Sequence, residues 1–329
     1  MKKTVNRFLT IIMAALAIAG AQSCMRYEKK ANTSTSGTMT MVCDNTFENI
    51  MNQEVDVFEY QYPDAHVLVR YASQSEAIDS LMSLNTKTIV IARDLTKDEM
   101  KYLKSKRSFV RSSKIAVDAV AFIVNPANDV NKLMLKELSQ ILSGETTEWN
   151  EVMPSKLGKI RVVLDNKGSS LAAYLRDSLL NGGKFAENVY DAGSIPGVFE
   201  AVEKDKNAIG VLGVSWITSD MDSADMAPDQ LAKSVLSDEP VQGATLSRRV
   251  KVLPICRNNE VTAYRPYQEN IFNGTYPLFR QIYMITTAHS GTTGGGFYSF
   301  VTGDIGQKII MKTGIMPARM RIQVVQLGE

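Results

Sequence analysis

Short apolar segments alternate with amphipathic segments along the first third of the chain, and this alternation constrains the fold more than any other feature. Apolar stretches of strand length lie at residues 38–43, 66–71 and 88–92. Between them, residues 47–58 and 75–84 carry apolar side chains at helical spacing. A β-α-β-α-β order predicts a mostly parallel, doubly wound sheet covered by helices. Ligands bind such sheets at the carboxyl ends of the strands, so the residues after each predicted strand are the first candidates for a site.

One further strand end lies near the middle of the chain. The apolar stretch 160–164 runs into a short polar loop, residues 165–170, and apolar residues then recur at helical spacing through residue 180. The first turn of such a helix offers unpaired backbone amides and a positive dipole end, which together favour an anion. Ordinary helix capping explains the same residue types, so this junction alone leaves both interpretations open.

Small polar residues also follow the three N-terminal strands. The carboxyl ends of parallel strands meet at one edge of a sheet, so a repeated pattern of this kind predicts a shared polar site. Dipoles and neutral donors can hold an anion there without burying many full charges. The residues after the first, second and third strands are Asn45, Thr46 and Phe47, then Ser73 and Ser75, then Arg93.

The first 37 residues predict export and anchoring. A basic start at Lys2, Lys3 and Arg7 precedes an apolar stretch, 8–21, which is too short for a stable membrane span but typical of a signal peptide. The residues just before Cys24 resemble the lipobox of bacterial lipoproteins, which implies a signal peptide over 1–23 and acylation of Cys24. Multiple acyl chains give durable anchoring; a plain secretory signal is the alternative. Residues 24–37 are expected to form a flexible tether.

Charge and cysteine content exclude several classes of protein. The formal net charge is +2, and residues 1–23 hold three basic and no acidic residues, so the remainder is near −1 and predicts no nucleic-acid partner. Apart from Cys24, only Cys43 and Cys256 are present. They could pair in an oxidising compartment, although Cys43 is expected to be a buried free thiol.

No motif predicts catalysis, a metal or a cofactor. The two histidines, His66 and His289, lie outside any metal-ligand spacing, and no nucleophile elbow is present. Residues 291–296 are glycine-rich but lack the ending of a phosphate-binding loop, so they are expected to form a flexible connection. The acidic stretch 218–239 misses the calcium-loop spacing and is expected to be a solvated insertion.

Several blocks of the chain, in order from about residue 38 to 317, resemble the solute-binding proteins of the phosphate ABC importer family. The most specific block includes Ser143-Gly144 and Trp149-Asn150. Each block also has an ordinary structural role, such as an amphipathic helix with a glycine stop. The blocks lie at 114–128, 138–152, 194–198, 208–213, 276–283 and 297–317.

This resemblance implies ligand-binding roles at the strand ends. Asn45, Thr46 and Phe47 match the family's first loop, and Ser73, with Ser75, matches its serine loop. Arg93 resembles a cleft residue of some members. The fourth junction matches the family's Arg-x-Asp-Gly-Ser-Gly-Thr loop through Asp165, Lys167, Gly168 and Ser169. Val163 stands where the family has arginine, so Lys167 is the candidate to replace that charge.

The resemblance implies an α/β fold of the two-lobed type II periplasmic-binding-protein class, in which each lobe is a doubly wound sheet. Lobe 1 is expected at 38–119 and 284–329, lobe 2 at 120–283, with two hinge strands near 117–124 and 280–286. The implied function is the capture of phosphate or a similar oxyanion for an ABC permease, by a monomer that is lipid-anchored to a bacterial membrane on its extracytoplasmic side. The alternatives are a non-transport signalling, adhesion or assembly lipoprotein and, less favoured, an extracytoplasmic phosphatase.

Overall fold

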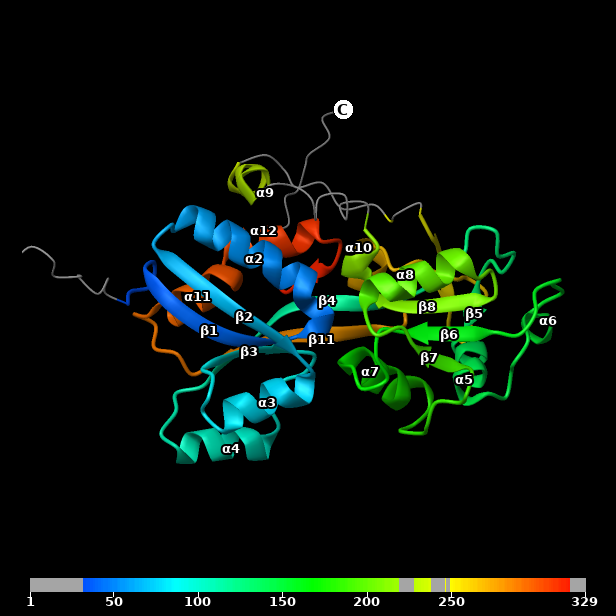
Figure 1. Ribbon diagram of the computed structural model, residues 1–329, viewed down its shortest axis with the longest axis horizontal. Coiled ribbons are helices and arrows are strands. Elements are labelled where there is room, and N and C mark those ends of the chain that lie inside the picture. The colour runs from blue at the N-terminus through cyan, green and yellow to red at the C-terminus, as the bar shows by residue number, and fades with distance from the viewer. Residues whose placement is uncertain (1–31, 219–227, 238–245, 247–248, 320–329) are drawn as a thin grey trace, which may run out of the picture. The chain divides into compact units, whose positions relative to one another are not determined.

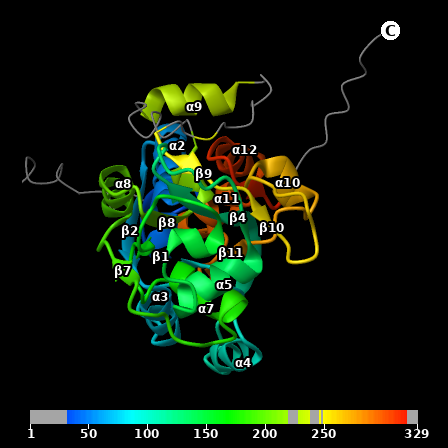
Figure 2. The same cartoon turned by 90° about the vertical axis from the view of Figure 1, so that its right-hand side faces the viewer.

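The computed structural model describes residues 32–218, 228–237, 246 and 249–319. Ten strands of this part of the chain form one sheet, whose main path runs β2-β1-β3-β11-β4-β8-β6-β7. Figures 1 and 2 show helices on both faces of this sheet. The predicted mixed α/β architecture is therefore present. Cys24 and the rest of residues 1–31 lie outside the described part of the chain. The last residues of the predicted tether, 32–37, are described and are held in place: the Thr293 amide donates to Asn32 Oδ1 at 2.8 Å, the Thr293 hydroxyl donates to the Ser36 carbonyl at 2.7 Å, and β1 begins at Gly37.

The first half of the sheet is built from the N-terminal β-α-β-α-β segment. Strand β1 pairs in parallel with both β2 and β3, and all four residues of β3 are buried. In Figure 1, α3 and α4 lie on one face, while α2, α11 and α12 lie on the other. The bounds are β1 (Gly37–Asp44), α2 (Glu48–Gln61), β2 (Ala65–Ala72), α3 (Gln74–Met82), β3 (Thr88–Ile91), α4 (Lys97–Ser105), α11 (Thr293–Val301) and α12 (Asp304–Lys312).

The second half repeats the arrangement around β8, β6 and β7. Strand β6 pairs in parallel with β7 and β8, and Figure 1 shows α5 and α7 on one face and α8 on the other. Short elements complete this half. The bounds are β5 (Leu133–Met134), α5 (Leu135–Ser143), α6 (Trp149–Val152), β6 (Arg161–Leu164), α7 (Ser170–Leu179), β7 (Val189–Asp191), α8 (Ile195–Lys204), β8 (Ala208–Gly213), β9 (Lys251–Val252), β10 (Ile255–Cys256) and α10 (Gln268–Phe272).

Two adjacent strands join the halves. Strand β4 (Arg111–Val124) pairs with β11 (Phe279–Thr286) over residues 111–119 and with β8 over residues 120–124. The last ten residues of β4 are buried, so this strand runs through the core. The short β12 (Met316–Pro317) also pairs with β4. This is the position expected for the hinge strands.

The remaining segments differ in how closely they match what the sequence predicts. The glycine-rich segment is not a loose connection: α11 begins within it, and a Cβ on Gly296 would lie 1.8 Å from the carbonyl oxygen of Ser34, so the segment is tightly packed. Within the acidic insertion, α9 (Pro228–Leu236) buries Leu231 and Val235 and packs against α2 and α12. Cys43 and Cys256 are both buried and free.

Among the described residues, no helix is long and apolar enough to cross a membrane.

Candidate functional site

The first and fourth predicted loops, one from each half of the sheet, meet at a buried contact. Thr46 lies in η2 (Asn45–Phe47), directly after β1, and Ser170 begins α7, directly after the loop that follows β6. Their hydroxyl oxygens are 3.2 Å apart although 124 residues separate them in the chain. Both residues are buried. The predicted convergence of strand ends therefore holds for these two junctions.

Each of these two turns is fixed by a carboxylate of its own. Asp44 caps η2, because its Oδ1 accepts hydrogen bonds from the Thr46 amide at 3.0 Å and the Thr46 hydroxyl at 2.9 Å. Ser169 caps α7 by accepting from the Ala172 amide, and its hydroxyl donates to Asp165 Oδ1 at 3.0 Å. Burial raises the pKa of Asp165, and the hydrogen bonds from the Asn166 amide and Ser169 oppose that rise.

An arginine from the hinge supplies positive charge to this contact. Arg280 on β11 is directly opposite Asp118 on β4. Its Nε and Nη2 donate to Asp118 Oδ2 at 3.2 and 3.0 Å, and its Nη1 donates to the Ser170 hydroxyl at 2.9 Å. The guanidinium carbon lies 4.5 Å from the ring centroid of Phe47, within the range of a cation-π contact. The remaining N–H groups of Arg280 have no acceptor in the described part of the chain.

The Arg280–Asp118 ion pair is almost completely withdrawn from solvent, with side-chain exposures of 2% and 0%. Burial raises the pKa of Asp118, and the guanidinium beside it opposes that rise. The Val214 amide donates to the other carboxylate oxygen at 3.1 Å. A Cβ on Gly213 would lie 2.6 Å from Asp118 Oδ2, so only glycine allows β8 to approach this carboxylate so closely. We refer to Asp44, Thr46, Asp118, Ser170 and Arg280 as the hinge cluster.

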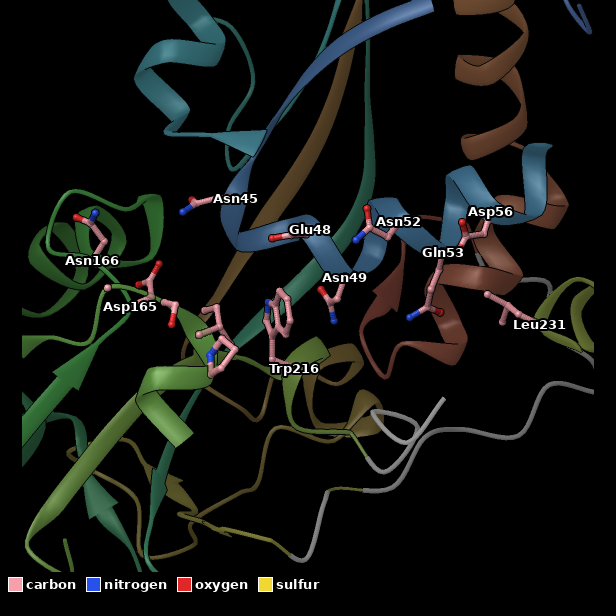
Figure 3. A pocket seen from close by; sticks show the side chains of 14 residues that line it. Asn45, Glu48, Asn49, Asn52, Gln53, Asp56, Asp165, Asn166, Trp216 and Leu231 are labelled. Carbon is pink, nitrogen blue, oxygen red and sulfur yellow. The ribbon is translucent and has the colours of Figure 1, made fainter. Parts of the chain in front are cut away.

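A cavity of 530 Å³ adjoins the hinge cluster. Figure 3 shows side chains of η2 and α2 on one side and, on the other, those of the β6–α7 loop and Trp216, with Leu231 of α9 at the far end. Asn45, which precedes Thr46 in the chain, and Asp165, which accepts from the Ser169 hydroxyl, line the cavity at the end nearest the hinge cluster. The five residues of the hinge cluster are not themselves among the lining residues. Trp216 is fixed there because its Nε1 donates to the Thr46 carbonyl at 3.0 Å.

The other predicted residues of the fourth junction are engaged within their own loop. The Lys167 amide donates to Asp191 Oδ1 at 2.6 Å, and the Gly168 amide donates to Asn166 Oδ1 at 2.6 Å. The Ser169 amide donates to the Asn166 carbonyl. The Lys167 ammonium has no hydrogen-bond or ion-pair partner in the described part of the chain. Of the residues predicted at the first and fourth junctions, Asn45 and Asp165 line the cavity, whereas Thr46, Phe47 and Ser169 are buried beside it. The Lys167, Gly168 and Ser169 amides have acceptors within the protein.

The structure does not bring the second and third loops to the hinge cluster. Ser73 forms a capping box with Glu76, to which its hydroxyl donates at 2.8 Å, and Ser75 is exposed. Arg93 donates to both carboxylate oxygens of Glu99 at 2.8 and 2.7 Å. None of these three predicted residues lines the cavity. Their assignment to the ligand stays a prediction.

The sequence pattern did not predict that Arg280, Asp118 and Ser170 belong to the site. A signal was present, because Asp118 and Arg280 are isolated charges in apolar strand segments, and a buried charge requires a partner. Their pairing could not be read from the chain, because 162 residues separate them.

No group of three or more His, Cys, Asp or Glu side chains that could hold a metal occurs within the residues that the structure places. The site instead combines hydroxyls, carboxylates, amides and one guanidinium, which is a set suited to binding a polar ligand.

Known proteins resemble this chain over most of its length. A family model described as a PBP superfamily domain matches residues 28–304. The phosphate-binding protein PstS of Pseudomonas aeruginosa is 21% identical over 94% of this chain and 91% of that protein.

Solved structures agree on the fold. A putative phosphate ABC transporter substrate-binding protein with bound phosphate from Clostridium perfringens has a TM-score of 0.65 and 19% identity, covering 86% of this chain and all of that one. An ABC-type phosphate transport receptor from Vibrio cholerae has a TM-score of 0.60 and 19% identity over 85% of this chain and all of that one. The predicted fold class, a two-lobed type II periplasmic-binding-protein fold, is confirmed.

Proposed function

Because this chain belongs to the PBP superfamily, we propose that it is an extracytoplasmic solute-binding protein that captures phosphate between its lobes for import by an ABC permease. The relatives named as phosphate-binding proteins support this proposal across nearly the whole chain. We assign residues 38–119 and 284–329 to lobe 1 and residues 120–283 to lobe 2. This function requires no chemical step, so the role that we propose is non-enzymatic.

One observation carries the proposal: hydroxyl groups from both halves of the sheet meet beside a buried guanidinium. Thr46 comes from one half and Ser170 from the other, and Arg280 donates to Ser170 at 2.9 Å from the strand that joins them. The Thr46 hydroxyl already donates to Asp44, so the donors that an oxyanion would use are the Ser170 hydroxyl, which can rotate, and the N–H groups of Arg280 that have no acceptor among the described residues. The ligand would therefore contact both lobes and the hinge at once.

This geometry couples binding to closure. An oxyanion that enters between open lobes would contact Thr46 or Ser170 alone, whereas closure brings the two hydroxyls within 3.2 Å of each other. A ligand shifts a conformational equilibrium by the difference in its affinity for the two states. The closed form would then be the state that a permease recognises.

The same proposal extends to the cellular position of the protein. Cleavage before Cys24 and acylation of that cysteine would anchor a monomer to a bacterial membrane on its extracytoplasmic side. Radiolabelled fatty acid incorporated by the wild-type chain and lost in Cys24→Ser would support the anchor, and equal labelling of both would refute it.

Calorimetric titration of the protein lacking residues 1–23 tests the ligand. We expect heat from phosphate at micromolar concentrations and at least about tenfold weaker binding of sulfate. Absence of phosphate heat at protein concentrations suited to micromolar binding would refute the proposal and favour the signalling, adhesion or assembly role instead. Release of phosphate from esters by the pure protein would refute the non-enzymatic assignment.

A further inference from the structure

The cavity beside the hinge cluster is much larger than an inorganic oxyanion requires. Its volume is 530 Å³, within the range of about 300–1,000 Å³ of pockets that enclose organic ligands. If each heavy atom of phosphate takes about the space of one water molecule, the ion fills roughly a quarter of this volume. Most of the cavity is therefore available to a second portion of a larger ligand.

The polar lining of the cavity matches hydroxyl groups. Asn52 and Gln53 on α2 and Asn166 on the β6–α7 loop contribute amides, and Glu48 and Asp56 contribute carboxylates. An amide offers both donors and an acceptor, as a hydroxyl does, whereas an ammonium group needs acceptors only. No Lys or Arg is among the residues that line this part of the described structure, and three carboxylates, those of Glu48, Asp56 and Asp165, are, so the lining disfavours a second anionic group.

The apolar part of the lining fits the carbon skeleton of such a ligand. The indole N–H of Trp216 is already bonded to the Thr46 carbonyl, so the ring offers carbon surface to the cavity. Ile195 and Pro196 at the start of α8 add further apolar surface. Planar polar side chains around an aromatic wall can bind both the hydroxyls and the C–H groups of a polyol.

Several of these polar groups have no partner within the protein. The side chains of Glu48 and Gln53 are half-buried and form no hydrogen bond or ion pair with any other described residue, whereas Asp56 is exposed to solvent. At the inner end, Asn45 Oδ1 is buried without a partner. A buried acceptor of this kind costs free energy until something donates to it. This observation is independent of the cavity's size and also indicates a ligand.

We infer that the cleft binds a phosphate ester of a small polyhydroxy compound, with the phosphoryl group at Thr46, Ser170 and Arg280 and the polyol in the adjoining cavity. This inference rests on the proposed oxyanion site and adds a second subsite to it. The phosphoryl end would use the hinge cluster, and the hydroxyls would use the α2 amides and carboxylates.

Titration of the protein lacking residues 1–23 with inorganic phosphate, glycerol 3-phosphate, glucose 6-phosphate and phosphoethanolamine tests the inference. We expect at least one polyol ester to bind at least about tenfold more tightly than inorganic phosphate. Gln53→Leu should remove that gain, and Gln53→Trp should fill the cavity and exclude the ester. Both variants should keep the wild-type affinity for inorganic phosphate, as should the matched control Asn259→Leu, an exposed amide outside the cavity.

The outcomes separate this inference from the proposed function. Phosphate binding without any gain for the polyol esters overturns the second subsite alone. A gain that survives both Gln53 variants, or a preference for phosphoethanolamine, also overturns it. If the wild-type protein lacking residues 1–23 binds neither phosphate nor any of the esters, both proposals are overturned.

Discussion

Two pairs of strand-to-helix junctions in this protein look alike in sequence but differ in what occupies their donors. After β1 and β6, the hydroxyls of Thr46 and Ser170 face each other across the two halves of the sheet. After β2 and β3, the caps of α3 and α4 are closed by their own glutamates: Glu76 returns to Ser73, and Glu99 returns to Thr96.

The difference lies in the third residue of each helix. A glutamate there completes a capping box, which places negative charge at the dipole end and satisfies the exposed donors. Such a helix start has few free backbone donors for an external anion. Helix α7 has no acidic residue in its first turn, so its N-terminus remains available. Capping residues alone are therefore a poor guide to an anion site, and the residue three positions later is more informative.

Loss of the buried Arg280–Asp118 ion pair should have the largest effect, a decrease in the free energy of unfolding. Arg280→Ala would leave Asp118 buried without its partner, and the loss of one member of a buried ion pair costs about 3–5 kcal/mol of unfolding free energy. The matched variant Arg93→Ala breaks a more exposed pair with Glu99 and should cost less than about 1 kcal/mol. Urea denaturation followed by circular dichroism measures both, and similar losses in the two variants would contradict the comparison.

Two threonines at helix starts, Thr46 within η2 and Thr96 at the cap of α4, should affect different properties of the protein. Thr46→Val removes the hydroxyl that lies between Asp44 and Ser170, and we expect phosphate affinity to fall about tenfold. Thr96→Val removes a cap that serves only α4 and should lower the unfolding free energy by about 1 kcal/mol with unchanged affinity. Paired calorimetry and urea denaturation check this, and the comparison fails if Thr96→Val weakens binding as much as Thr46→Val.

The closed capping box after β3 should contribute stability that depends on pH. Hydrogen bonds from Arg93 and Thr96 lower the pKa of Glu99 from 4.5 to about 2. Because the folded pKa is lowered, the stabilisation is complete above about pH 4.5 and is lost as pH falls toward 2. Glu99→Gln should therefore be less stable by about 1 kcal/mol at pH 7, after allowance for solvent screening, and the difference should vanish near pH 2. A difference that is constant with pH would refute this role.

Substitution of Lys167 should have the smallest effect, which we expect on phosphate affinity. Its ammonium group has no partner among the described residues, and Arg280 already supplies positive charge from the hinge. We expect Lys167→Ala to change phosphate affinity by less than about twofold. A loss of tenfold or more in the same titration would show that Lys167, rather than Arg280, replaces the charge absent at Val163.

Local sequence determined the elements and their caps. Apolar periodicity predicted the first three strands and the helices between them within a few residues of their observed bounds, because that pattern reflects which side chains face the core. The glycine-rich segment was mispredicted for a related reason. Glycine disfavours a helix by propensity, but here close packing against Ser34 requires a residue without a side chain.

The chain by itself therefore specified an alternating α/β fold and the strand ends that could hold a ligand, and its resemblance to a known family implied the two lobes. Only the tertiary structure decided which strand ends meet, that Arg280 lies opposite Asp118, and that a cavity of 530 Å³ adjoins them. The physical reason is the distance along the chain between the residues that determine each feature. Caps and periodicity depend on neighbours within a few residues, whereas strand register and the space between two lobes depend on segments more than a hundred residues apart.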